Sequence, residues 1–190
     1  FSLSSIITLE NMNIKKFQEI NINKILSSKQ LIKKINSKNE INFKSKKFDK
    51  ILIDDLNLHI DLAYGRLVYS KKIFISENIF SCLGEVNLLE DYPILYFDCS
   101  ILSKDKKKLL KEFSVKYKNK NELFKLDVIG NINILNNKIN FNKIILNNNY
   151  QASKEDLNYF KNLFEKIIFN EDLLRVFNLK KIKEFILEIS

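Results

Sequence analysis

The sequence predicts an α+β protein, built from an antiparallel β-meander with C-terminal helices. Two observations carry this prediction. Apolar and polar residues alternate with a period of two through the middle of the chain, and the last 40 residues change to helical spacing. Glycine occurs three times and proline once among 190 residues, so no segment has the composition of a flexible linker. We expect strands and a short helix leading into the sheet over residues 1–50, the sheet body over 51–150 and a helical cap over 151–190.

The first 50 residues lead into the main sheet. Residues 2–9 and 12–17 have the apolar content of short strands. Five apolar residues between positions 22 and 35 are spaced as on a short amphipathic helix, which precedes the lysine-rich stretch 44–50.

The body alternates most clearly over residues 55–62, where every even position is leucine or isoleucine. Tyr64 and Gly65 predict a turn, after which the extended pattern returns. Asn136 and Asn137 predict a hairpin turn, because asparagine tolerates positive φ. Further extended segments are predicted over 67–69, 73–75, 80–88, 95–101, 113–117, 124–134 and 139–141.

Helical signals occur within and after this sheet. Ser103 is positioned to cap a lysine-rich helix over 104–111. Ser153 and Asp156 resemble a capping box with a shorter acid, and an apolar stripe follows them as far as Ile168. Asn170 is positioned to cap a second short helix through residue 177. Residues 179–189 fit either a third helix or, in part, a strand.

The two cysteines lie on the apolar faces of consecutive predicted strands. A hairpin turning at Glu90–Asp91 places opposite each other the residues whose numbers sum to 181, and 82 plus 99 is 181. Opposed Cβ atoms lie about 4.5–5.5 Å apart, near disulfide range. Cys82 and Cys99 are therefore either a disulfide, in an oxidising compartment, or two small buried apolar residues, and we favour the second interpretation.

The formal net charge of +9 raises the question of nucleic-acid binding, but only Arg66 and Arg175 among the 32 basic residues are arginine. Nucleic-acid binders favour arginine for base edges and phosphates, so we expect no nucleic-acid partner. Abundant Lys, Asn, Ile and Phe fit a bias toward AT-rich codons. The densest basic group is interpreted as a solvated face that is also compatible with anionic headgroups: Lys104, Lys106, Lys107, Lys108 and Lys111.

No residue pattern indicates catalysis, so we expect neither an enzyme nor a cofactor. The single histidine, His59, lies between acids on the polar side of a strand, where a solvent-facing side chain is expected. Neighbouring strand residues point to opposite faces, so neither Asp54–Asp55 nor Glu90–Asp91 can act as a carboxylate dyad. No spacing of His, Cys or acids indicates a metal site, and no glycine-rich phosphate loop is present.

No apolar run reaches the roughly 18–20 residues of a membrane span. The first residue is Phe1 and no cleavable leader follows it, so we interpret the chain as a piece of a longer protein whose targeting signal or anchor lies upstream.

Three segments carry a resemblance to a known family. Residues 50–76 form a strand–Gly–strand unit followed by another apolar strand, residues 128–146 form a hairpin between sheet layers, and a helical tail follows Ser153. In these features the chain resembles the C-terminal region of AsmA-like proteins, the bacterial envelope family that includes the TamB-type bridge proteins.

The resemblance implies a curved, groove-like sheet on the periplasmic side of the bacterial inner membrane, held there by an upstream anchor and involved in phospholipid transport and outer-membrane biogenesis. The partner it implies is the phospholipid acyl chain, lying on an apolar concave face. The C-terminal helix over 153–169 is expected to cover one end of the groove with Phe160, Phe164 and Ile168. The expected groove residues are Leu56, Leu58, Ile60, Leu62, Leu126, Val128, Ile132 and Ile134.

An alternative function is a scaffold or protein-interaction β-domain. It has the same sheet with its apolar face fully covered by the chain's own helices, and no lipid conduit. An open groove lined by aliphatic side chains distinguishes the first function from the second.

Overall fold

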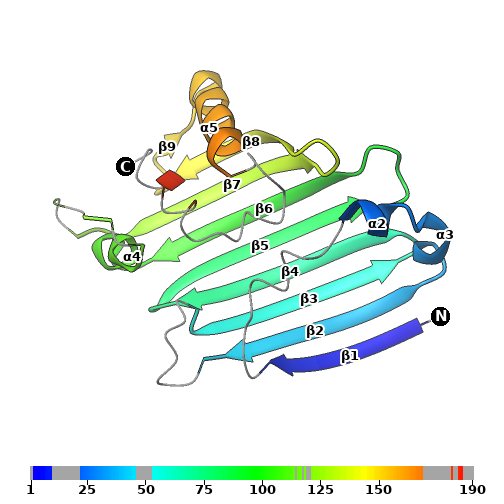
Figure 1. The fold of residues 1–190 in the computed structure, drawn as a ribbon. Coiled ribbons are helices and arrows are strands. Elements are labelled where there is room, and N and C mark those ends of the chain that lie inside the picture. The colour runs from blue at the N-terminus through cyan, green and yellow to red at the C-terminus, as the bar shows by residue number, and fades with distance from the viewer. Residues whose placement is uncertain are drawn as a thin grey trace.

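The computed structural model describes residues 2–9, 22–45, 53–113, 115, 116, 118, 121–168, 181, 184 and 185. It confirms the α+β class. Nine strands form one open sheet in the order of the sequence, from β1 at one edge to β9 at the other (Figure 1). The strands are β1 (Ser2–Leu9), β2 (Asn36–Lys44), β3 (Asp55–Ala63), β4 (Arg66–Ile75), β5 (Asn78–Asn87), β6 (Ile94–Ser103), β7 (Phe124–Asn133), β8 (Lys138–Leu146) and β9 (Tyr150–Gln151).

Four helices occur in this part of the chain: α2 (Ile22–Leu26), α3 (Lys29–Ile32), α4 (Lys106–Glu112) and α5 (Lys154–Ile167). From β2 to β9 each strand runs antiparallel to its neighbour, as the meander predicts. The first pair is different, because β1 runs parallel to β2. A parallel pair needs a crossover connection, and residues 10–35, which include α2 and α3, supply it.

Strand β2 was not predicted. Only Ile41 and Phe43 among its nine residues are strongly apolar, so the alternation is too weak to see in the sequence. The strand forms because it pairs with β3, where Ile41 lies opposite Leu58 and Phe43 lies opposite Leu56. The helix expected over 22–35 is in fact two short helices with a turn at residues 27 and 28.

Two local predictions around α4 are wrong. The helix is capped by Asp105, whose side chain accepts from the Lys108 N–H, and not by Ser103, which is the last residue of β6. The predicted strand over 113–117 does not form at its described residues. The N–H groups of Phe113 and Val115 both donate to the Leu110 carbonyl, because burying these two side chains against the sheet end outweighs extension.

The cap of α5 agrees with its prediction. Ser153 accepts from the Asp156 N–H, and the Asp156 carboxylate accepts from the Ser153 N–H, completing the capping box. Glu165 at the other end accepts from the Ile139 N–H of β8 and pairs with Lys138. Three residues were expected to cover one end of the groove. The side chains of Phe164 and Ile168 pack with Ile139 of β8, whereas the ring of Phe160 contacts Tyr159. Residues 12–17 and 169–177, where a strand and a second helix were expected, lie outside the described residues.

The pairing gives the sheet two unlike faces. We call the side that carries the even-numbered residues of β3, Leu56 to Leu62, the apolar face, and the side that carries His59 the polar face. Every buried cluster of the described chain lies on the apolar face. The clusters lie beneath α2 and α3 (with Val86), beneath α4 (with Ile75) and beneath α5 (with Ile139).

Two glycines allow aromatic rings to lie across the strands on the apolar face. A Cβ on Gly84 would come within 2.3 Å of the Tyr69 ring, and one on Gly130 would come within 2.6 Å of the Phe97 ring. Gly84 lies opposite both Tyr69 and Phe97. The β7–β8 register also shifts between Ile129 and Gly130, a bulge that bends the sheet. These glycines therefore mark where the sheet needs close approach and curvature.

Candidate functional site

A band of side chains crosses the middle of the apolar face at right angles to the strands. In it Ile41 lies opposite Leu58, Leu58 opposite Lys71, and so on across the sheet to Val128 on β7. We call this band the central strip: Ile41, Leu58, Ile60, Tyr69, Lys71, Cys82, Cys99 and Val128. None of these residues belongs to the three buried clusters of the described chain.

Helices flank the central strip. Figure 1 shows α2 and α3 at one end of the strands, α4 at the opposite end, and α5 beside β8. Their separation follows from the clusters, which use Leu62 and Leu67 beneath α3 but Ile73 and Ile101 beneath α4. The residues of the apolar face that lie between these two sets of cluster residues form the central strip. From β2 to β7 the strip crosses five strand spacings, roughly 24 Å at about 4.8 Å each.

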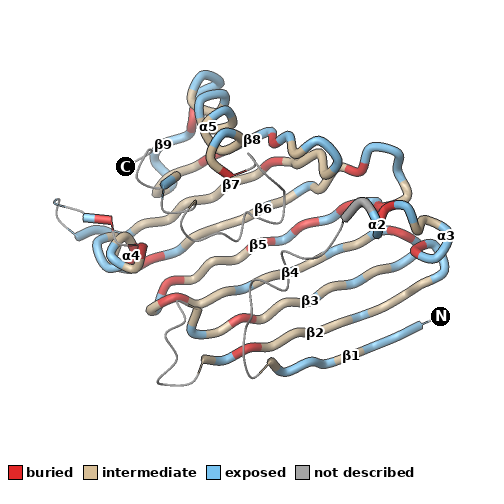
Figure 2. Tube along the Cα trace, viewed as in Figure 1, coloured by how far each residue is buried: buried red, intermediate tan, exposed pale blue. Residues whose placement is uncertain are grey.

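The eight expected groove residues share one sheet but not one environment. Leu56 is buried, and the other seven are half-buried. Leu62 and Ile134 pack beneath α2 and α3, and Ile132 packs beneath α5. Figure 2 shows most of the sheet in this intermediate class. The expected residues that lie on the apolar face outside the described buried clusters are Leu58, Ile60, Leu126 and Val128.

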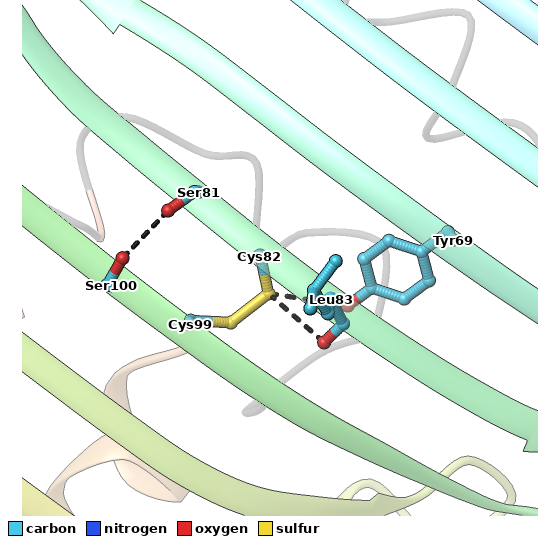
Figure 3. Close-up of a disulfide and its surroundings, with 6 residues drawn as sticks. All are labelled: Tyr69, Ser81, Cys82, Leu83, Cys99 and Ser100. Atoms are coloured by element: carbon cyan, nitrogen blue, oxygen red, sulfur yellow. Dashed lines mark hydrogen bonds between the residues drawn. A yellow bond between two sulfur atoms is a disulfide. The ribbon is translucent and has the colours of Figure 1, made fainter.

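Cys82 and Cys99 are joined, at an S–S distance of 1.97 Å, in the middle of the strip (Figure 3). Their predicted register is confirmed, since the two residues are directly opposed on β5 and β6. Of the two interpretations the sequence left open, the structure has the disulfide, which was the less favoured. On the opposite face of the same strands, the hydroxyls of Ser81 and Ser100 form a hydrogen bond of 2.7 Å.

Two polar groups lie among the apolar residues of the strip. Burial raises the pKa of Tyr69, whose hydroxyl lies 3.5 Å from Cys82 Sγ. Burial lowers the pKa of Lys71, which pairs with Leu58 and Cys82 on its two sides. Each shift has the same cause, a low-dielectric environment that disfavours the charged form. The strip is thus an apolar surface with an amine and a phenol set into it.

The polar face carries a hollow that sequence reasoning missed. It has a volume of about 470 Å³ and spans β3 to β8. Carboxylates and apolar side chains alternate in it, among them Asp61, Asp98, Leu83 and Tyr96. Leu83 and Tyr96 are 59% and 52% exposed. The available signal was a set of apolar residues out of phase with the dominant alternation of their strands: Val68, Leu83, Tyr96 and Ile129. The hollow of this sheet therefore lies opposite the face on which a concave groove was expected.

The candidate polar residues lie where solvent reaches them. The His59 side chain is 55% exposed and its Nδ1 lies 3.9 Å from a carboxylate oxygen of Glu40. Asp54 accepts from the Ser76 N–H in a turn, and Asp91 pairs with Lys29. In the lysine group near α4, Lys106 pairs with Glu122 and Lys108 with Glu77. These residues are not brought together into one site.

Within the described ranges no three His, Cys, Asp or Glu side chains approach closely enough to hold a metal ion. No helix there combines the length and apolarity needed to cross a membrane. Comparison with protein-family models, curated proteins and solved structures gives no match.

Proposed function

We propose that the chain is a non-enzymatic lipid-binding module whose central strip holds phospholipid acyl chains across the strands. The observation that carries the proposal is the half-buried apolar band between helices at both strand ends. Leu58, Ile60 and Val128 lie in this band and join none of the described buried clusters. Such a surface needs no specific polar residues, because each buried methylene contributes about 0.8 kcal/mol.

The resemblance to AsmA-like envelope proteins supports the same function. It adds a periplasmic location, an upstream membrane anchor and a role in outer-membrane biogenesis to the proposal. The disulfide Cys82–Cys99 is compatible with that location, since structural disulfides persist in oxidising compartments. Because the hollow lies on the polar face, acyl chains are expected to lie on the central strip between the helices and not in a concave groove.

Lipid binding is tested by comparing substitutions on the central strip with substitutions on the opposite face of the sheet. Val128 and Ile129 are both half-buried on β7, with Val128 on the strip and Ile129 in the polar-face hollow. We expect the purified protein to contain phospholipid by mass spectrometry. The double variant Leu58→Asn, Val128→Asn should lose at least about tenfold in binding of a fluorescent phospholipid, because two methyl-rich contacts become polar.

The matched control is Val68→Asn, Ile129→Asn, which makes equivalent changes on the polar face. It should bind lipid as the unmodified protein does, and circular dichroism should show that both variants are folded. Lipid missing from the unmodified protein, or lost equally in both double variants, would contradict the proposal and favour the interaction domain without a lipid conduit.

A further inference from the structure

Strand β1 lies at one edge of the sheet that the described residues form. Among the described residues β1 pairs only with β2, and it is the last strand on its side. Its side chains are largely solvent-exposed, with Leu3 at 61%, Ile6 at 77% and Ile7 at 43%. The strand SLSSIITL contains no charged residue, no proline and no glycine. Its own sequence therefore supplies no charged residue or proline of the kind that usually protects an edge from further pairing.

The opposite edge is different. Strand β9 has only two residues, and α5 is fixed to β8 through Glu165, which accepts from the Ile139 N–H. Lys138, Asn140 and Lys143 place polar groups along β8 beside it. Among the described residues, β1 has neither the short length, nor the covering helix, nor the charge that protects this edge. Addition of a strand is thus confined to one side of the sheet.

The sequence of β1 is close to a palindrome. Read from either end, residues 3–9 (LSSIITL) begin with leucine and a hydroxyl residue and have isoleucine at the centre. In antiparallel pairs opposite residues point to the same face, so a two-fold pair that keeps the apolar faces together must pair odd with odd residues. A register in which the numbers of the two paired residues sum to 12 satisfies this condition. It sets Leu3 opposite Leu9, Ser4 opposite Thr8, Ser5 opposite Ile7 and Ile6 opposite itself.

We propose that β1 pairs antiparallel with β1 of a second copy of this chain, about a two-fold axis at Ile6. The open edge supplies backbone donors and acceptors, and the near-palindrome supplies self-complementary side chains. No like charges oppose each other within the strand pair. The arrangement closes at two copies, because β1 is the one edge without such protection among the described strands. It also continues the apolar face from one copy to the next, although the pairing itself does not depend on lipid binding.

Light scattering over a concentration series tests the pairing. The unmodified chain should move from 22.5 kDa toward twice that mass as concentration rises. Ile6→Lys sets two ammonium groups opposite each other at the axis, so the association constant should fall by about tenfold or more. Leu31→Lys makes the same change from an aliphatic residue to lysine at a residue 64% exposed on α3; it is the matched control and should leave association unchanged. A mass that stays at 22.5 kDa, or a dimer that Ile6→Lys leaves intact, would overturn the proposal.

Cysteine cross-linking tests the register. Because the native cysteines are bonded to each other, Ile6→Cys introduces one free thiol, and across the axis it lies about 4.5–5.5 Å from its own copy. Mild oxidation should give a dimer on non-reducing gels that reductant reverses. Thr8→Cys lies on the same face of β1 but opposite Ser4 of the other copy, so it should not cross-link. Cross-linking through Thr8→Cys in preference to Ile6→Cys would overturn the register.

Discussion

The two faces of the sheet share one backbone but differ in how their side chains are packed. On the apolar face lie the disulfide and every buried cluster of the described chain. On the polar face, exposed apolar side chains such as Leu83 and Tyr96 alternate with carboxylates around a hollow. Since strand neighbours point to opposite faces, we expect the stability of the fold to depend mainly on the side chains of the apolar face.

The largest expected difference is between Phe43 and Leu83. Phe43 is 1% exposed on the apolar face of β2, opposite Leu9 and Leu56, whereas Leu83 is 59% exposed on the polar face of β5. We expect Phe43→Ala to lower the free energy of unfolding by about 3–5 kcal/mol, because it leaves a cavity. Leu83→Ala should change it by no more than about 0.5 kcal/mol. Urea unfolding measures both, and similar losses would mean that the faces contribute alike.

The second comparison uses two adjacent cross-strand pairs. Replacing Cys82 and Cys99 together by alanine removes a link across a separation of 17 residues and should cost about 3 kcal/mol, mainly through a less restricted unfolded chain. Replacing Ser81 and Ser100 by alanine removes one half-buried hydrogen bond and should cost about 1 kcal/mol or less. Thermal unfolding of the two double variants, both without free thiols, gives the comparison directly. Equal shifts in Tm would argue against a stabilising role for the disulfide.

The third comparison sets Gly84 on the apolar face against its neighbour Glu85 on the polar face. A methyl group there would meet the Tyr69 ring, so Gly84→Ala should cost about 1–3 kcal/mol by overpacking the apolar face. Glu85→Ala, on the next residue and the opposite face, removes only an exposed ion pair with Arg66 and should cost less than about 1 kcal/mol. Adding Tyr69→Ala should make the cost of Gly84→Ala smaller, measured as a double-mutant cycle. Additive changes in the free energy of unfolding would show that the Tyr69 ring is not what excludes a methyl group at position 84.

Much of this fold can be predicted from local patterns. The hairpin at Asn137, where φ is 54°, and the turn at Gly65, where φ is 86°, follow from residues that tolerate positive φ. The register of Cys82 and Cys99 follows from the turn between them. Strand β2 and the parallel pairing of β1 do not, because each depends on a partner strand that a local window does not contain.

The candidate site could be predicted only in part. Alternation identifies the residues of the apolar face, but the partition among helices and strip depends on where α3 and α4 pack. For that reason alternation alone predicts Leu62 and Ile132 in the groove, although they lie beneath helices. The polar-face hollow arises from how six strands bend together, with a bulge beside Gly130. Such curvature is a property of the assembled sheet.

The smallest expected effect concerns the cover of the apolar face at α5 and its dependence on pH. Hydrogen bonds from the Tyr150 hydroxyl, and then from Ser153, lower the pKa of Asp156 in the folded protein. A folded pKa below the unfolded value, about 3.9, stabilises the protein above that pH, and the contribution is lost as pH falls through the folded value. Asp156→Ala should therefore be less stable than the unmodified protein near pH 6, and the difference should shrink below about pH 4. Asn158→Ala, an exposed and non-titrating change in the same helix, should give a difference independent of pH. Urea unfolding at pH 6 and pH 3 measures both. A difference for Asp156→Ala that persists unchanged at pH 3 would show that the carboxylate's charge does not contribute to holding α5 on β8.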